Sequence, residues 1–556
     1  MTTTLINRLK PSSAASISSG RLWFVMGLLV ALAVMVPVAA LGFEALGGSM
    51  ALWQHLAAYV LPQALIETLI LLCGVGLVVM VVGTGSAWLV TAYEFPGRRV
   101  LEWALLLPLA VPTYIIAYAY LDLLHPLGPV QGLIRAILGY DSPRQFRLPD
   151  IRSMAGCILL LGFVLYPYVY ITTRAMFMTQ AANLVEAARM LGVSRSGIFF
   201  RIALPLARPA IAVGVSLALM ESLNDIGASE FLGVRTLTIS VYTTWVTRSD
   251  LAGAAQIALA MLMIVVAVVA IERLARRRQR YFSAAKQARR FAPLPLSRGA
   301  GIAALGFGLV PVLIGFAAPA IYLAVEAMKR IETNGLSTRL IGELGNTLGL
   351  ASAATLVVLV LGTTVAYMAR ALPGSLTQLL MRLSTLGYAM PGTVVALGVL
   401  IPLATLDGMI DRQAQALFGV STGLLLIGSG AALIFAYAVR FMAIAAGSAE
   451  TGFARIPTSL DQAARSLGRN VNGTFFAICL PLSRPALAAA GLLVFVDCMK
   501  ELPATLLLRP LNVETLATHL YAEAARGTYE EAAVAALAIV LAGLLPVILL
   551  ARIGRR

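Results

Sequence analysis

Apolar residues in this chain of 556 residues run in long stretches that hold no charged residue and are separated by short polar segments. A helix needs roughly 20 apolar residues to cross the hydrocarbon of a bilayer. Backbone groups in lipid must be paired within the segment, so such stretches are helices. Ten stretches meet this requirement and predict membrane spans: 22–43, 68–93, 103–121, 153–173, 251–271, 299–325, 344–369, 383–406, 413–439 and 532–551.

Two further segments, 209–220 and 485–496, are uncharged for only 12 residues each before they meet carboxylates. Both become apolar again beyond the charges, and counting them as spans predicts twelve in all. The carboxylates come in pairs four residues apart, which predicts one helix face for each pair; the pairs are Glu221 with Asp225, and Asp497 with Glu501.

An ionisable group inside a span costs roughly 2.5–3.5 kcal/mol on insertion scales and tends to face a cavity. The two pairs are therefore candidates for lining a translocation path, where hard carboxylate oxygens would suit a cation as transient ligands. The alternative is that they lie at the outer ends of the spans, in water, or pair with Lys500 and Asn224.

Composition and charge agree with a membrane protein. The chain is 59% hydrophobic and 12% charged, against about 25% charged in soluble domains. Its net charge is +16, and the Lys and Arg residues are concentrated in alternate loops, as the positive-inside rule requires. This distribution predicts cytoplasmic N- and C-termini. The basic cluster at 272–290 is interpreted as a topology anchor, not as a nucleic-acid site.

The chain contains an internal repeat. EAARMLGVSRSGIFFRIALPLARPAI, from Glu186, matches QAARSLGRNVNGTFFAICLPLSRPAL, from Gln462, without a gap. Two more matches, 67–87 with 346–366 and Pro112 with Pro391, extend it. An even number of spans in each half predicts a parallel repeat about an axis along the membrane normal. We expect a cytoplasmic tail at 1–21, a first repeat at 22–273, a basic cytoplasmic linker at 274–298 and a second repeat at 299–556.

The repeated stretch predicts two short helices at an angle. Gly192 suits a turn, Ser194 suits the N-cap of the second helix, and Pro205 and Pro209 are expected to break that helix and restart it as a span. One interpretation is an amphipathic helix resting on lipid headgroups. The other is a docking helix for a cytoplasmic partner, with two copies implying two partner subunits.

The spacing EAA, Gly, nine residues, I-x-L-P resembles the coupling motif of bacterial ABC importer permeases with MetI-like (type I) domains. The matching residues are Glu186, Ala187, Ala188, Gly192, Ile202, Leu204 and Pro205, and Gln462, Ala463, Ala464, Gly468, Ile478, Leu480 and Pro481. The resemblance covers nearly the whole chain. It implies a type I all-α permease fold, two ATPase subunits docked on these residues and an extracytoplasmic substrate-binding protein. Gln462 replaces the acidic first residue, which implies unequal coupling sites.

Within this family the chain resembles the fused twelve-span permeases of ferric-iron importers, on the stretches 497–524 and 222–245. Related fused permeases for thiamine or phosphonates are the alternative substrates. From a different class, a secondary transporter driven by protons or sodium would explain the carboxylates but not the repeated motif. A non-transporting membrane scaffold is the third hypothesis.

Several functions are not expected of this chain itself. A phosphate-binding loop needs G-x-x-x-x-G-K-[S/T], and the four lysines, at 10, 286, 329 and 500, are followed by Pro, Gln, Arg and Glu. ATP and Mg are therefore expected on a partner ATPase, and no catalytic residue is expected here. Four scattered cysteines without CxxC spacing predict neither disulfides nor a stably bound metal.

Overall fold

The structure is a computed structural model that describes residues 13–47, 50–180, 188, 190–277, 293–335 and 337–553. Within these residues nearly all regular structure is helical. The two strands, β1 (Tyr93–Glu94) and β2 (Leu294–Pro295), pair in parallel with Tyr93 opposite Leu294. The predicted all-α polytopic membrane fold is confirmed.

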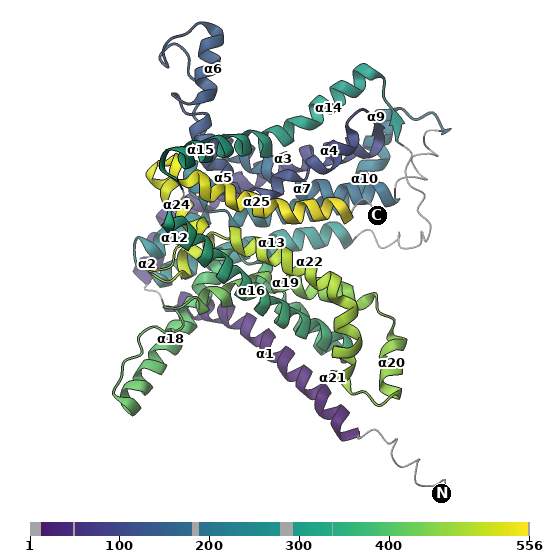
Figure 1. The fold of residues 1–556 in the computed structure, drawn as a ribbon, viewed down its shortest axis with the longest axis vertical. Coiled ribbons are helices and arrows are strands. Elements are labelled where there is room, and N and C mark those ends of the chain that lie inside the picture. Colours follow the sequence, from purple (N-terminus) through teal and green to yellow (C-terminus); the bar gives the residue numbers. More distant parts are fainter. Residues whose placement is uncertain are drawn as a thin grey trace. The chain divides into compact units, whose positions relative to one another are not determined.

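The helices form two compact units, and each is described by itself (Figure 1). Unit 1 comprises Met1–Gly47 and Gly342–Thr515. Its helices, with η for 3-10 and π turns, are α1 (Ser13–Leu46), α16 (Thr338–Ala371), α17 (Ser375–Ser384), η6 (Leu386–Ala389), α18 (Gly392–Phe418), α19 (Ala431–Ala454), α20 (Thr458–Ser466), α21 (Val471–Thr474), η7 (Phe475–Cys479), α22 (Leu480–Lys500) and α23 (Pro503–Leu508).

Unit 2 comprises Gly48–Ile341 and Leu516–Arg556. Its helices are α2 (Met50–His55), η2 (Leu56–Val60), α3 (Leu61–Ala92), α4 (Arg98–Ala104), η3 (Leu107–Ala110), α5 (Thr113–Leu123), α6 (Pro129–Leu138), α7 (Met154–Gln180), α9 (Arg195–Ile198), η4 (Phe199–Ala203), α10 (Leu204–Asn224), α11 (Gly227–Phe231), α12 (Leu237–Val246), α13 (Leu251–Arg277), α14 (Arg298–Val312), η5 (Leu313–Ala317), α15 (Ala318–Asn334), α24 (Leu516–Arg526) and α25 (Tyr529–Ile553).

The units are assembled from both ends of the chain. In unit 1, α1 packs against helices of the second sequence repeat: a Cβ at Gly27 would contact Met368, and Gly398 lies against the backbone of Pro37. In unit 2, α15 contacts α5 of the first repeat, where the Tyr322 hydroxyl donates to Asp122 at 2.6 Å. The compact units therefore differ from the two stretches of sequence that repeat, because helices are exchanged between them.

Membrane-length helices account for the predicted spans. The described residues contain eleven helices long and apolar enough to cross a membrane, or twelve if one bent pair counts as a single span. That pair, Arg98–Ala110 and Thr113–Leu123, turns by 93°. The bend lies where Pro112 disfavours a helical backbone at the residue before it, and Val111 is extended. The predicted span 103–121 is thus a bent helix pair.

The span predicted at 413–439 is wrong in its bounds. α18 continues to Phe418, and the next helix, α19, begins only at Ala431. Gly419 ends α18 in the left-handed conformation, with φ 67°. Asp411 then holds the returning loop by accepting from the backbone N–H of Thr422 at 2.7 Å and of Gly423 at 3.1 Å. The loop between α18 and α19 contains no charged residue, so the absence of charge alone did not distinguish it from a span.

Equivalent glycines allow close helix packing in both units. At Gly83 in α3, an added Cβ would lie 2.8 Å from the carbonyl oxygen of Tyr166 in α7. At Gly362 in α16, it would lie 2.8 Å from the backbone nitrogen of Ala446 in α19. Small residues let helix backbones approach in membrane proteins, so the repeat preserves this contact.

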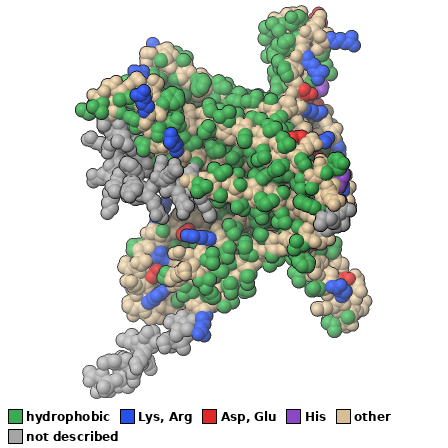
Figure 2. Space-filling model, turned by 180° about the vertical axis from the view of Figure 1, so that it is seen from behind, with side chains coloured by type: hydrophobic (Ala, Val, Ile, Leu, Met, Phe, Trp, Pro, Cys, Tyr) green, Lys and Arg blue, Asp and Glu red, His purple; other side chains and the backbone are tan. Residues whose placement is uncertain are grey.

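The outer surface is apolar, as a membrane protein requires. Figure 2 shows hydrophobic side chains over much of the visible face, with few Lys, Arg, Asp and Glu among them. Large side chains that are well exposed include Leu29, Val81, Phe307 and Leu356. α6 projects away from the rest of unit 2 (Figure 1).

Candidate functional site

The second repeated element, residues 458–481, has the predicted elbow. α20 carries Gln462, Ala463 and Ala464, and the chain turns at Gly468, whose φ of 82° is left-handed. The Asn470 side chain then caps α21 by accepting from the Gly473 N–H at 2.8 Å. The turn therefore depends on a glycine, because other L-residues rarely adopt this conformation.

The first repeated element, the described residues of 186–205, follows the same plan. Gly192 turns with φ 73°, and Ser194 accepts from the Gly197 N–H at 3.2 Å. The predicted N-cap at Ser194 is confirmed. Ala188 is described, whereas Glu186 and Ala187, which complete the predicted motif, lie outside the described residues.

The predicted helix break at Pro205 is wrong. α9, η4 and α10 form one continuous helix over Arg195–Asn224, and α21, η7 and α22 do the same over Val471–Lys500. A π-turn precedes each proline: the Leu204 N–H bonds to the Phe199 carbonyl, and the Leu480 N–H to Phe475. The wider turn lets the proline ring enter without the clash it causes in an α-helix. Ile202 and Ile478 lie within these π-turns, and Leu204, Pro205, Leu480 and Pro481 begin the spans.

Aromatic side chains fix each element to its bundle. In unit 2, the Trp88 ring lies 5.3 Å from Phe177 and 5.3 Å from Phe199. In unit 1, Tyr367 takes the place of Trp88 and lies 4.7 Å from Phe475. Trp88 and Tyr367 were missed in the sequence, although they immediately follow the matching stretches 67–87 and 346–366.

The second element has anchors that the first lacks at the equivalent positions. Trp23 of α1 donates to Asn472 at 2.7 Å and packs on Tyr367. Arg370 donates to Asp461 at 3.0 Å and to the Ile456 carbonyl at 3.0 Å. The residue that corresponds to Asn472 is Ser196, and the one that corresponds to Arg370 is Thr91. Neither Trp23 nor Arg370 was predicted, since neither is part of the repeated pattern.

The tips of the two elements are matched in exposure. Leu191 and Leu467, each next to its turn glycine, are both 83% exposed. Ala188 and Ala464, on the inner side of each turn, are buried. Each turn therefore presents an exposed leucine directly before a glycine with a left-handed backbone.

The four predicted carboxylates do not share helix faces as expected. α10 ends at Asn224 and α22 at Lys500, so Asp225 and Glu501 have extended backbone and lie beyond the helices. Glu221 is part-buried within α10. Asp497 pairs with Lys500 at 2.8 Å, as the alternative interpretation anticipated.

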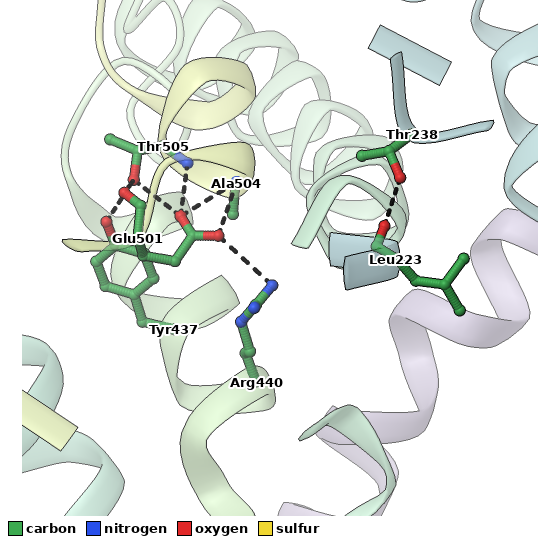
Figure 3. A network of polar contacts seen from close by, with 7 residues as sticks. All are labelled: Leu223, Thr238, Tyr437, Arg440, Glu501, Ala504 and Thr505. Carbon is green, nitrogen blue, oxygen red and sulfur yellow. Dashed lines mark hydrogen bonds and ion pairs between the residues drawn. The ribbon is translucent and has the colours of Figure 1, made fainter. Parts of the chain in front are cut away.

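Asp225 and Glu501 are both buried and cap the short helix that follows. Asp225 accepts from the Ser229 N–H at 2.8 Å and its hydroxyl at 2.9 Å. Glu501 accepts from the backbone N–H groups of Ala504 and Thr505 and from the Thr505 hydroxyl at 3.0 Å (Figure 3). A carboxylate at a helix N-terminus satisfies unpaired N–H groups. We call each of these carboxylates, with the helix end before it and the capped helix after it, a corner. α10 and α22 each end directly before the carboxylate of its corner.

The two corners differ in their remaining partner. Asp225 accepts from the Thr113 hydroxyl at 2.6 Å. At the equivalent of Thr113 the second repeat has Gly392, and Arg440 approaches Glu501 to 3.5 Å. A Cβ at Gly392 would lie 2.5 Å from both charged side chains. The glycine therefore makes room for a buried ion pair at this corner, where the described residues of the first corner have a threonine.

Near the first corner, the Thr238 hydroxyl donates to the carbonyl of Leu223, in the last turn of α10 (Figure 3). This bond ties α12 to the end of the span. Across the described part of the chain, no three His, Cys, Asp or Glu side chains gather in a way that could hold a metal ion.

Comparison with known proteins gives the family. The family model for the inner membrane component of binding-protein-dependent transport systems matches twice, at residues 79–281 and 359–556. The chain is similar to Fe(3+)-transport system permease protein FbpB 2 of Haemophilus influenzae, with 24% identity over 88% of this chain and 90% of the relative. It is also similar to Sulfate transport system permease protein CysW of Escherichia coli, with 30% identity over 40% of this chain and 75% of the relative. Molybdenum transport system permease protein ModB of Escherichia coli is 32% identical over 33% of this chain and 82% of the relative.

Proposed function

We propose that this chain, which belongs to the family of binding-protein-dependent transport system inner membrane components, forms the translocation pathway of an ATP-driven importer for ferric iron. Family membership makes it a multi-pass membrane permease and supports our proposal that it works with ATPase subunits and a substrate-binding protein. The cation-coupled secondary transporter and the non-transporting scaffold are set aside on this ground.

In our proposal the chain lies in the bacterial inner membrane with both termini in the cytoplasm. Two ATPase subunits, which hold ATP and Mg, dock on the first and second repeated elements. The observation that carries this role is the matched pair of exposed tips, Leu191 and Leu467, each presented on a left-handed glycine turn. Movement of an ATPase against a tip would reach the membrane through the continuous helix that follows each element.

Charge introduced at the tips tests the docking. Leu191→Glu with Leu467→Glu should abolish ATP-dependent uptake in proteoliposomes and prevent co-purification of the ATPase subunits. Leu511→Glu is the matched control, because Leu511 is fully exposed at the opposite end of α22 and belongs to neither element. Full co-purification with the doubly substituted chain would refute docking at the tips.

Ferric iron is proposed as the substrate because the similarity to the Fe(3+) permease extends over both repeats. The sulfate and molybdenum relatives match only 40% and 33% of the chain. Permeases for thiamine or phosphonates are the alternatives. Uptake of labelled ferric iron, with sulfate, molybdate, thiamine and phosphonate as competitors, separates these substrates. Iron uptake that none of the four reduces is the expected result, and uptake of another substrate without iron would overturn it.

The pathway role of Glu221, Asp225, Asp497 and Glu501 stays a prediction. Because Asp225 and Glu501 cap α11 and α23, we propose that they act by fixing the corners of the pathway rather than as ligands. Their carboxylate oxygens already accept hydrogen bonds, so an ion would have to displace those donors.

A further inference from the structure

A cluster of oxygen-bearing side chains in unit 2 lies outside the sites described above. The hydroxyl of Tyr521 in α24 donates a hydrogen bond to the carboxylate of Glu230 in α11. The hydroxyl of Tyr242 in α12 is a second hydrogen-bonding partner of Tyr521. Phe231 stacks on the Tyr521 ring, with centroids 5.7 Å apart and planes 28° apart. Three short helices thus bring two phenols and one carboxylate together.

The two tyrosines are equivalent residues of the internal repeat. VRTLTISVY, ending at Tyr242, aligns with VETLATHLY, ending at Tyr521, at the offset of 279 that also relates Pro112 to Pro391. The helices that carry them begin at equivalent leucines, Leu237 and Leu516. When equivalent residues of two repeats touch, the contact lies on the pseudo-twofold axis that relates them. In a permease built from parallel repeats, the substrate path follows that axis.

The cluster also lies at the correct end of the spans. α11 follows the corner at the end of α10, and the first repeated element is at the other end of that helix. With the repeated elements facing the ATPases, the cluster faces the side from which the binding protein delivers substrate.

The donor set favours a hard cation over an oxyanion. Among the described residues, the Glu230 side chain makes no ion pair and its hydrogen-bonding partner is Tyr521. Carboxylate and phenolate oxygens are hard ligands suited to a trivalent cation. Sulfate or molybdate would instead need N–H donors or Lys and Arg. The Glu230 side chain is exposed, whereas Tyr242 and Tyr521 are less exposed, so the carboxylate can meet an arriving ion first.

We infer that Glu230, Tyr521 and Tyr242 form a transient ferric-iron site on the axis of the permease, which rests on the proposed function. Without a cation, the Tyr521 hydroxyl keeps its proton and donates a hydrogen bond to the Glu230 carboxylate. As iron binds, Tyr521 loses that proton to solvent and its phenolate oxygen coordinates the ion with Glu230. Tyr242 supplies a third oxygen, and water or a carried chelator fills the remaining positions. Three protein ligands hold the ion weakly enough for it to leave.

The site has one carboxylate and no twin. The second-repeat residue that corresponds to Glu230 is Leu506, which follows the corner at Glu501 as Glu230 follows the corner at Asp225. One Fe³⁺ per chain is therefore the expected stoichiometry, despite the internal symmetry.

Absorption spectroscopy tests the site directly on the purified full-length permease with its ATPases. Ferric citrate should produce a visible phenolate-to-iron charge-transfer band that saturates at one iron per chain. Tyr521→Phe, which keeps the stack on Phe231, should abolish the band. Glu230→Gln should keep the band and raise the half-saturating iron concentration about tenfold or more. Tyr322→Phe is the matched control, since it removes another phenol that donates to a carboxylate, Asp122, and should change nothing.

The possible results separate this site from the proposed function. A wild-type protein without the band, or a band that survives Tyr521→Phe and Tyr242→Phe together, overturns the site while iron uptake still stands. A band of equal strength in every variant identifies adventitious surface iron and also overturns it. If Tyr521→Phe does not fold, the half-saturating iron concentration of Glu230→Gln is the test instead. A concentration equal to that of the wild-type protein refutes the site. Absence of iron uptake with an intact band would refute the transport function instead.

Discussion

At Asp225, the buried carboxylate that ends α10 is held by a threonine, a serine and backbone N–H groups. At the equivalent Glu501, the same capping bonds are joined by Arg440, which fills space left by Gly392. The same corner is thus built once with neutral partners and once with a buried ion pair. Breaking a buried pair costs more than removing a neutral hydrogen bond, because the other charge stays behind without a partner.

The repeated elements differ in the same direction. Both have the glycine turn, the cap and the π-turn. The second is also tied to α1 through Trp23 and to α16 through Arg370, and the residues at the equivalent positions of the first repeat, Ser196 and Thr91, differ from Asn472 and Arg370. Among the described residues, the second repeat thus has a charged anchor at each end of its long helix, Arg370 near one end and Arg440 near the other. The internal repeat thus preserves backbone geometry while its side-chain supports diverge.

The largest expected difference is between Glu501→Gln and Asp225→Asn. Glu501→Gln removes the carboxylate charge that faces the buried Arg440 guanidinium and should destabilise the protein by about 3–5 kcal/mol. Asp225→Asn weakens hydrogen bonds but strands no cation, which should cost about 1–3 kcal/mol. Thermal unfolding of the purified protein in detergent measures both.

The control for this pair removes both charges. Glu501→Gln combined with Arg440→Met should recover most of the lost melting temperature, because no unpaired charge remains. Equal losses for Asp225→Asn and Glu501→Gln, or no recovery in the double variant, would mean that the ion pair does not distinguish the two corners.

Second in size is the effect of side chains at the turn glycines. Gly192→Val and Gly468→Val force a β-branched residue into a left-handed backbone, at a cost of roughly 1–2 kcal/mol each. Space around both positions is open, so the damage should be confined to the turn. Uptake should be lost while membrane insertion and yield stay unchanged. Gly349→Val, at an open helical position with ordinary backbone, is the control. Uptake that survives both turn substitutions would contradict the coupling role.

Much of this fold could be predicted because bilayers impose simple rules. Uncharged runs located the spans, and the constant offset revealed the repeat. The cap at Ser194 followed from its place after the turn glycine. These features depend on local pattern, which one sequence displays. They also identified the repeated elements as the first place to look for function.

Other features depended on partners far apart in the chain. The four-residue spacing of the carboxylates in apolar segments predicts that Asp225 and Glu501 lie inside helices, whereas both lie just beyond a helix end. The hydroxyl four residues later, Ser229 or Thr505, was the available sign of a capping corner. The π-turn before Pro205 leaves no comparable sign. Nor did the sequence pair Trp23 with Asn472, since α1 joins the other repeat's helices only in the folded unit.

The smallest expected effect tests the fastening of the second element. Asn472→Ala removes the acceptor for the Trp23 indole N–H, bonded at 2.7 Å, which should cost about 1 kcal/mol. Backbone amides of α21 should then exchange hydrogen about fivefold faster, without a change in the first element. Ser196→Ala, at the equivalent position, removes only a local contact with Ser194 and should leave exchange unchanged. If Ser196→Ala accelerated exchange in the first element as much as Asn472→Ala does in the second, the two elements would be fastened alike. The bond from Trp23 to Asn472 would then not distinguish the two repeats.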